Sequence, residues 1–458
     1  MKIIVCVRQG LDGEISPFDA SAYEEALKID EAEITLLSMG APSAFDFLLK
    51  LTRLGAKNAV LLTDKAFAGA DTLATAYALS LAIKKLSPEL VFCGRQTLIG
   101  DTAQTPVMLA EMLKFNLITN VMKIEKIENN SIFSKTREGK SENVSFPALI
   151  TVEKISSLRF PRLRSKMGEV TVWSAADIGA DVSKCGLAGS PTRVIKTFEN
   201  QSGKRKCTFI SRDKLTDAIE DGLKKSLNRI ENDAIDSKEK LSKVFIVGSA
   251  CEKFAKDVSD NIVDIGFLDA DTVCDRIKCE KPDAVIFGSD ASSKRLSATV
   301  AARLSFGLTA DCTRLECENG ELIMYRPALS GSIIAKIKSL TTPAMATVRT
   351  ETDNKKRIIV GVGFGAKDSM DKAQELALQL DAELVFSRKL VDNGYAKYES
   401  QVGLTGKTVS PPVYIAIGIS GAVHHVVGIQ RSGTIIAINP DPKAPIFEYA
   451  DYGIIDEF

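Results

Sequence analysis

At 458 residues, the chain is long enough for about three domains of ordinary size. Lys plus Arg and Asp plus Glu both number 59, so the balanced charge gives no sign of a nucleic-acid or membrane-surface partner. The sequence starts directly with a strand-like apolar run, and its best apolar stretch, 414–429, is interrupted by Gly, Ser and two His. We therefore expect no export signal, no membrane insertion and a cytoplasmic location.

The first half alternates strand and helix patterns. Strands are expected at 2–7, 33–39, 58–62 and 89–93, and helices at 20–28, 41–54 and 71–85. After Gly94, the segment Asp101-Thr-Ala-Gln104 has the form of a capping box that would start the next helix. Because ligands sit beyond the carboxyl ends of parallel strands, this segment marks a candidate nucleotide site.

A repeat links the two halves of the chain. Leu90-Val-Phe-Cys-Gly94 is echoed by Ala284-Val-Ile-Phe-Gly288, and the segment 146–152 recurs as 342–348 at an offset of 196 residues. Two collinear matches indicate two homologous α/β units that can pack about a pseudo-two-fold axis.

The nine cysteines are an odd number without any CxxC, which argues against a disulfide framework. Cys274/Cys279 and Cys312/Cys317 share a four-residue gap that suggests an iron–sulfur site, but no close third ligand accompanies either pair. Core or surface thiols are the favoured interpretation.

The C-terminal region 357–451 predicts a doubly wound β/α unit. Its strands at 357–362, 383–386, 414–419 and 434–438 are followed by small or polar residues, and 369–380 has helical periodicity. Ser387, Arg388, Ser420 and Asn439 all follow strand ends, where such sheets bind ligands. Taken alone, the glycines at 361, 363 and 365 are an incomplete dinucleotide fingerprint and fit a tight turn equally well.

Several motifs together resemble the electron-transferring flavoproteins. The C-terminal region is similar to the FAD domain of their alpha subunit, and the first half is similar to their beta subunit. The alpha-like motifs are Ser387-Arg388-Lys-Leu-Val-Asp, Gln401-Val-Gly-Leu-Thr-Gly-Lys, Gly418-Ile-Ser-Gly-Ala-Val-His-His and Ala450-Asp-Tyr-Gly; the beta-like motifs are Ser16-Pro-Phe-Asp, Gly69-Ala-Asp-Thr, Cys93-Gly-Arg-Gln, Gly100-Asp-Thr-Ala-Gln and Leu187-Ala-Gly-Ser-Pro-Thr-Arg.

The resemblance implies a single-chain fusion of the α/β class: two pseudo-symmetric doubly wound α/β domains plus a C-terminal Rossmann-like FAD domain. The expected segments are a beta-like nucleotide-binding domain at 1–190, an arm that packs on the FAD domain at 191–227, a fusion linker at 228–242, a shortened first alpha domain at 243–350 and the FAD domain at 351–458.

Carried over by position, the resemblance places Arg388 over the isoalloxazine, Thr405 near its N5 edge and His425 near O2. Neighbouring helical residues point about 100° apart, so His424 is expected on the surface. Phe364 and Leu404 depart from the family pattern. The remaining expected FAD contacts are Gly363, Gly365, Ser387, Gln401, Gly403, Gly406, Ser420, Gly421 and Ala422, with Asn439 and Asp451 on the adenosine side.

A second nucleotide, FAD or AMP, is implied for the N-terminal half. The small residues of its motifs look like the electron-bifurcating members, which would add NADH and a ferredoxin or flavodoxin as partners. The expected contacts are Cys6, Met39, Asp71, Thr72, Gly100, Asp101, Gln104 and Thr105.

The loop 159–167 matches the family's partner-recognition loop, with Leu163 as the apolar anchor for an acyl-CoA dehydrogenase-type flavoenzyme. An ordinary solvated basic turn is the alternative for this loop. For the whole chain, the expected function is electron transfer through FAD. The alternatives are a simple carrier with FAD and AMP, an NADP-dependent dehydrogenase in which Arg388 contacts a 2′-phosphate, and a nucleotide-binding regulatory module.

Overall fold

The computed structural model describes residues 1–10, 13–97, 100–153, 155–199, 204–229, 239–329, 333–349, 356–403 and 406–458. The chain forms two compact units. The base unit comprises Met1–Thr197, Ser237–Leu329 and Ala335–Val348, and the C-terminal unit comprises Phe198–Asp236, Ser330–Ile334 and Arg349–Phe458. The expected linker lies largely outside the described residues, so the five-part division stays a prediction.

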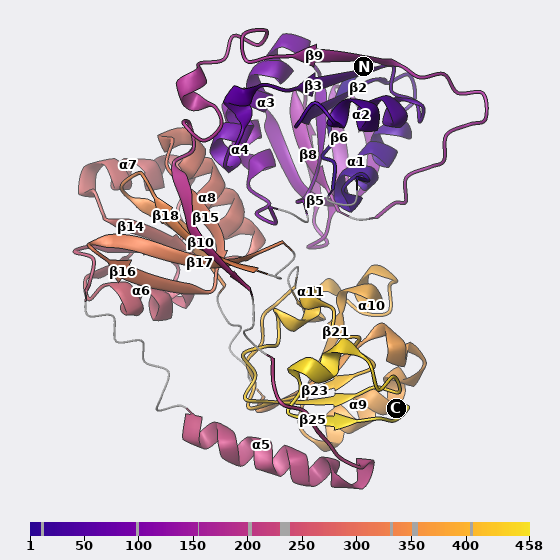
Figure 1. The fold of residues 1–458 in the computed structure, drawn as a ribbon, viewed down its shortest axis with the longest axis vertical. Coiled ribbons are helices and arrows are strands. Elements are labelled where there is room, and N and C mark those ends of the chain that lie inside the picture. Colours follow the sequence, from indigo (N-terminus) through magenta and orange to yellow (C-terminus); the bar gives the residue numbers. More distant parts are fainter. Residues whose placement is uncertain are drawn as a thin grey trace. The chain divides into compact units, whose positions relative to one another are not determined.

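The first half of the base unit is a sheet with helices on both faces (Figure 1). Its strands are β1 (Lys2–Cys6), β2 (Glu33–Met39), β3 (Asn58–Leu62), β4 (Leu90–Gly94), β5 (Asn116–Glu128), β6 (Ser131–Thr136), β7 (Ser141–Ser145), β8 (Ala148–Val152) and β9 (Glu169–Trp173), in the order β7-β6-β5-β8-β4-β1-β2-β3-β9. Neighbours pair in parallel from β5 to β9, whereas β6 and β7 are antiparallel.

Alternate strand residues serve the two faces of this sheet. Ile3 and Val5 pack with α1 (Pro17–Leu27) and α2 (Ala44–Thr52), whereas Ile4 packs with α3 (Thr72–Leu86) and α4 (Thr105–Leu113). The predicted strands and the first three helices are confirmed to within a few residues.

The second half repeats this order. Strands β12 (Val244–Val247), β13 (Ile262–Asp264), β14 (Ala284–Phe287), β15 (Leu308–Cys312) and β19 (Ala344–Val348) form the parallel sheet β13-β12-β14-β19-β15. This matches β2-β1-β4-β8-β5 of the first half. Its helices are α6 (Glu252–Val258), α7 (Ala270–Glu280) and α8 (Ala291–Leu304). A smaller sheet, β10-β18-β17-β16, comprises β10 (Thr192–Glu199), β16 (Arg314–Glu318), β17 (Glu321–Ala328) and β18 (Ile333–Ser339).

The repeat is confirmed down to an irregularity of the backbone. Asn120 and Asp311 have left-handed φ values of 59° and 55°, and each N–H donates to a threonine hydroxyl, of Thr151 and Thr347, at 2.8 Å. These threonines lie 196 residues apart, which is the offset seen in the sequence. Helix α4 packs against α8, and one apolar core runs through both halves.

The C-terminal unit is a seven-stranded parallel sheet in the order β11-β25-β24-β23-β20-β21-β22. Its elements are β11 (Thr208–Phe209), α5 (Leu215–Arg229), β20 (Ile358–Val362), α9 (Met370–Gln379), β21 (Glu383–Ser387), α10 (Arg388–Asp392), β22 (Gln401–Val402), β23 (Val413–Ile417), α11 (Val423–Val426), β24 (Thr434–Ile438) and β25 (Tyr452–Ile454). The segment 204–229 thus packs on this unit, because β11 pairs with β25 and α5 covers β23 and β24.

Candidate functional site

The C-terminal sheet reverses its winding at β20 and β23. From β20 the chain continues to β21 on one side and returns to β23 on the other, which is the point where doubly wound sheets bind ligands. Gly363 N–H donates to Ile417 O at 2.7 Å, and a Cβ on Gly363 would lie 2.2 Å from Gly418 O. Gly365 N–H donates to the same carbonyl at 3.1 Å. Position 363 therefore requires glycine.

Ser387 and Arg388 lie where β21 ends, as predicted. Ser387 Oγ is buried and has no hydrogen-bond partner among the described residues. Arg388 opens α10, and its Nε donates to Asp392 Oδ2 at 2.9 Å one helical turn away. About a quarter of the Arg388 side chain is exposed. The aspartate therefore orients the cation without enclosing it.

The two histidines of α11 have different surroundings. His425 is buried, and its Nε2 lies 3.0 Å from the Tyr414 hydroxyl. Burial lowers the pKa of His425 to about 4, against a backbone hydrogen bond with Val402, so the ring is neutral at neutral pH. His424 was expected on the surface and is half-buried instead, because α11 lies against Gly403. Burial and then the charge of Arg388 lower the pKa of His424.

Two other predicted FAD contacts, Asn439 and Asp451, bind groups of the protein itself. Asn439 Nδ2 donates to Ile419 O at 3.0 Å, and its Oδ1 accepts from Asp441 N–H. Asp451 forms an ion pair with Arg205 and accepts from Ile435 N–H at 2.8 Å. Gln401 and Gly421 are buried, Ser420 and Ala422 are exposed, Gly403 and Gly406 adjoin β22, and Thr405 lies outside the described residues.

A cavity of about 1060 Å³ opens at the carboxyl ends of β1, β2 and β4 in the base unit. Seven of the eight residues predicted for the second nucleotide line it: Cys6, Met39, Asp71, Thr72, Gly100, Gln104 and Thr105. Asp101 does not; it is buried, and the Gln96 amide donates to its carboxylate. The second half of the base unit contributes Leu308, Thr309, Ala310, Arg326 and Ile337 to the lining.

The predicted capping box is wrong. Helix α4 begins at Thr105, and Asp101 and Ala103 have left-handed φ values of 51° and 55° that no helix accommodates. Gln104 precedes the helix, but its side chain makes no cap. Its Oε1 accepts from Thr72 Oγ1 at 3.3 Å, and its buried Nε2 has no partner among the described residues. An amide donor is thus available at the cavity wall.

Two buried charged residues of the cavity were not among the predicted contacts. Arg326 on β17 is buried; its Nη2 donates to Asp101 O at 3.0 Å, and its Nε has no partner among the described residues. Asp19 is buried and accepts from Arg8 N–H at 2.9 Å. Burial raises the pKa of Asp19 to about 7, more than the hydrogen bonds from Arg8 and Gly94 lower it. For Arg326, the one available signal was a cation within the apolar run of β17.

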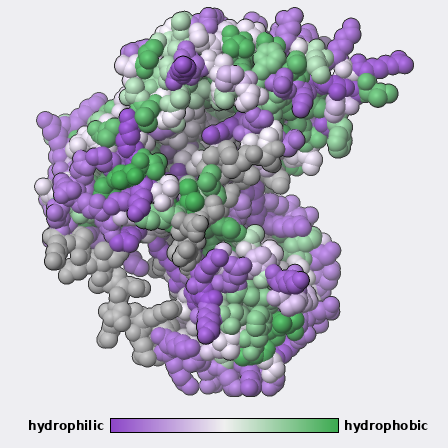
Figure 2. All heavy atoms as spheres, viewed as in Figure 1, coloured by the Kyte–Doolittle hydropathy of each residue, from purple (hydrophilic) through white to green (hydrophobic). Residues whose placement is uncertain are grey.

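The predicted partner loop stands out from the base unit. Phe160 and Leu163 are 93% and 97% exposed, and Met167 is exposed as well. Figure 2 shows apolar atoms among hydrophilic ones at the edge where this loop projects. Exposed large apolar side chains of this kind mark interaction sites more often than folding contacts.

Comparison with known proteins identifies the family. The electron transfer flavoprotein domain matches residues 3–178 and 269–383, and the electron transfer flavoprotein FAD-binding domain matches residues 353–430. The chain belongs to the electron transfer flavoprotein family. The duplicated fold explains why one family model matches it twice.

The relatives match different parts of the chain. Protein FixA of Azorhizobium caulinodans is 41% identical over 44% of this chain and 79% of its own length. The electron transfer flavoprotein subunit alpha of Thermoanaerobacterium thermosaccharolyticum is 36% identical over 41% of this chain and 71% of its own length. The subunit beta of Clostridium acetobutylicum is 40% identical over 42% of this chain and 78% of its own length. This flavoprotein is therefore a single-chain fusion of beta-like and alpha-like parts.

The remaining sequence observations concern thiols and membranes. Cys274, Cys312 and Cys317 are buried and Cys279 is exposed. Within the described ranges, no three His, Cys, Asp or Glu side chains gather as metal ligands. Among the helices that the structure describes, none combines the length and apolarity needed to cross a bilayer.

Proposed function

We propose that this flavoprotein carries electrons through FAD held at the winding reversal of the C-terminal unit. The residues there suit the cofactor. Glycine at 363 lets the turn pass close to the Gly418 backbone, Ser387 offers a buried hydroxyl that has no partner among the described residues, and Arg388 is an oriented cation. Bound FAD supplies one- and two-electron redox chemistry. Arg388 favours negative charge on the ring, and neutral His425, braced by Tyr414, can hydrogen bond without adding charge.

Arg388→Ala tests this assignment. We expect the ratio of FAD to protein to fall and the reduction potential of the remaining flavin to become more negative, because the cation beside the ring is lost. Lys389→Ala is the matched control, since Lys389 is the exposed neighbour of Arg388. An Arg388→Ala protein with wild-type FAD content and potential would show that Arg388 does not face the ring.

We further propose that the cavity of the base unit holds a second FAD. The single observation that favours FAD over AMP is size: about 1060 Å³ lies at the top of the range of about 300–1,000 Å³ for small-molecule pockets. Arg326 and the amide of Gln104 supply donors for phosphate or ring oxygens. The alternative is a simple carrier with AMP in the cavity.

Two flavins would divide the electron pair of NADH between a low-potential carrier, ferredoxin or flavodoxin, and an acyl-CoA dehydrogenase-type flavoenzyme. Cofactor extraction tests the proposal. We expect two FAD per chain and bleaching of the flavin absorbance by NADH. One FAD and one AMP, without bleaching by NADH, would leave a simple carrier. The match of the FAD-binding domain to residues 353–430 argues against an NADP-dependent dehydrogenase, which would require the same segment.

The loop 159–167 is proposed as the docking site for the dehydrogenase partner, and we call it the docking loop. Leu163→Ala should slow electron exchange at limiting partner without changing FAD content, because an exposed anchor contributes to docking and not to folding. Charge reversal at Arg162 should mainly change the salt dependence of the rate. Equal rates for Leu163→Ala and wild type would remove the docking assignment.

A further inference from the structure

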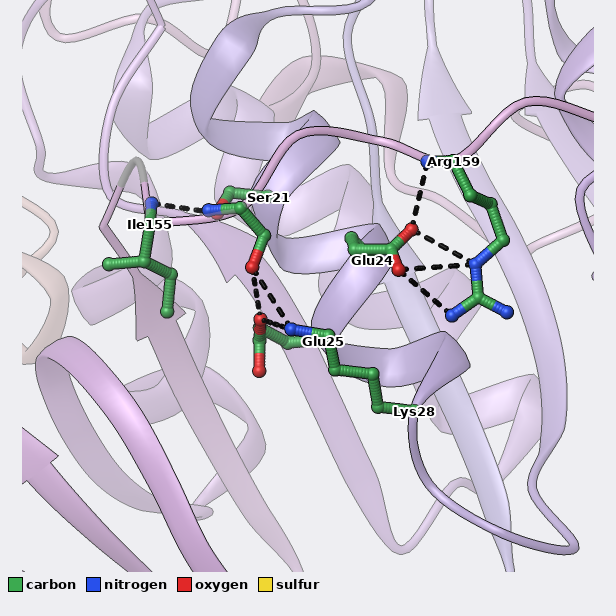
Figure 3. Close-up of polar contacts among 7 residues, drawn as sticks. Ser21, Glu24, Glu25, Lys28, Ile155 and Arg159 are labelled. Carbon is green, nitrogen blue, oxygen red and sulfur yellow. Dashed lines mark hydrogen bonds and ion pairs between the residues drawn. The ribbon is translucent and has the colours of Figure 1, made fainter.

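The docking loop is fixed to the base unit by helix α1. Ser21 Oγ accepts from the N–H groups of Ile155 and Ser156 at 3.0 and 2.9 Å, just before the loop (Figure 3). The Ser156 hydroxyl donates to Glu25, which also pairs with Lys28. The side chains of one helix therefore capture the backbone that leads into the loop.

Glu24 makes the strongest of these contacts, with the first residue of the loop. Arg159 N–H donates to Glu24 Oε2 at 3.0 Å, Arg159 Nη2 donates to Oε1 at 2.9 Å, and Arg159 Nε lies 3.1 Å from both oxygens (Figure 3). Burial raises the pKa of Glu24, but the hydrogen bonds from Arg159 outweigh it and leave the pKa below its usual range. A charged carboxylate therefore binds both the backbone and the fork of one arginine.

The far end of the loop is fixed too. Gly168 N–H donates to Thr52 Oγ1 at 2.9 Å, and a Cβ on Gly168 would lie 2.3 Å from Lys57 O. Between the two anchored ends, Phe160 and Leu163 are more than nine-tenths exposed. Phe160 directly follows Arg159, so the contact of the Arg159 backbone with Glu24 sets the position of Phe160.

We propose that Glu24 and Arg159 form a positioning clamp that holds the docking loop in its binding conformation and presents Phe160 as a second apolar anchor beside Leu163. The partner surface that fits is an apolar pocket with an acidic rim, because the exposed Arg162 and Arg164 flank Leu163 and Lys166 follows in the same loop. Ordering the loop before binding lowers the entropy cost of docking. The inference rests on the docking role proposed above.

Limited trypsin digestion tests the clamp without any partner, since Arg162, Arg164 and Lys166 are cleavage sites within the loop. Glu24→Gln should raise the rate of cleavage there by about fivefold. This is the effect of losing one charge-assisted hydrogen bond, reduced because Arg159 is partly exposed. Glu111→Gln is the control, because Glu111 is 14% exposed against 10% for Glu24 and binds Arg303 through the same fork. Equal cleavage rates in wild type and Glu24→Gln would overturn the clamp.

Electron exchange with a reduced acyl-CoA dehydrogenase then separates the clamp from the docking role. We expect Glu24→Gln and Phe160→Ala to raise the partner concentration for half-maximal rate severalfold, with the maximal rate and FAD content unchanged. Arg159→Lys should give a partner concentration between those of wild type and Glu24→Gln. If Leu163→Ala weakens exchange but Glu24→Gln and Phe160→Ala do not, the clamp fails and the docking site stands. If none of the three weakens exchange, the docking role itself fails and the inference falls with it.

Discussion

The two halves of the base unit make the same passage from strand to helix in different ways. Ten residues, 95–104, separate β4 from α4, whereas only three, 288–290, separate β14 from α8. In the second half, the Asp290 carboxylate accepts from the N–H groups of Ser292 and Ser293 at 3.0 Å, so α8 caps itself.

In the first half, Gln104 makes no cap, and the longer passage adjoins the cavity. The sheets beneath follow one order, down to the threonine that bonds a left-handed residue in each half. Two copies of one fold can therefore differ at the passage from strand to helix through the length of one loop and the choice of one cap. The core need not change.

The largest expected effect is on the pH dependence of stability, because the first half of the base unit buries Asp19. Its pKa of about 7 exceeds the value of about 3.9 in an unfolded chain, so between these values only the folded state binds the proton. The free energy of unfolding should fall by roughly 2–4 kcal/mol as pH rises from about 4 to about 7, then level off.

Asp19→Asn should remove this slope. Urea unfolding at several pH values between 4.5 and 8 measures it. Parallel curves for the variant and the wild type would mean that Asp19 does not carry the dependence.

Two cations, the buried Arg326 and the partly buried Lys294, should separate nucleotide binding from folding stability. Arg326→Met should weaken retention of the nucleotide proposed for the cavity by at least about tenfold while leaving the C-terminal FAD in place, because a charged donor is lost. Lys294 of the second half pairs with Asp311 at 2.8 Å. Lys294→Met should instead lower the free energy of unfolding by about 2 kcal/mol, with both cofactors retained. Extracted cofactor ratios measure the first effect and urea titrations measure the second. Loss of stability in Arg326→Met with its nucleotide retained, or loss of nucleotide in Lys294→Met with its stability retained, would contradict these roles.

The smallest expected effect compares the two helix starts. Asp290→Ala should cost about 1 kcal/mol of stability, because two N–H groups of α8 lose their acceptor. Gln104→Ala should cost less, because its side chain caps nothing, yet it should weaken nucleotide retention severalfold. Thermal melts with and without bound nucleotide measure both. A stability loss for Gln104→Ala equal to that of Asp290→Ala would show that Gln104 supports the helix after all.

Much of the fold could be predicted because parallel strands covered on both faces appear as continuous apolar runs. β20, β23 and β24 fall within a residue or two of the predicted ranges; Ser387 is the last residue of β21, and Asn439 follows β24 as expected. Each candidate site lies at the carboxyl ends of parallel strands, and the order of strands and helices along the sequence already indicates where those ends are.

The details of the cavity could not be predicted in this way. The capping pattern at 101–104 is a local signal, and it was overruled by contacts from Gln96 and from Arg326, which is 225 residues away. Pro106, in the first turn of α4, was the better local indicator of where that helix begins. The approach of the α11 backbone to Gly403 likewise joins parts of the chain that lie about 20 residues apart, so a local pattern does not reveal it.

The short strand β11 has a consequence for assembly. It extends the C-terminal sheet with residues from the end of the beta-like part, and Arg205 just before it binds Asp451 and the carbonyls of Gln430 and Ser432. In relatives made of separate subunits, an equivalent contact would have to form between molecules. Here the encounter is intramolecular, with an effective concentration set by the connecting chain. Dilution should therefore leave its melting temperature unchanged, where a two-chain assembly would lose stability.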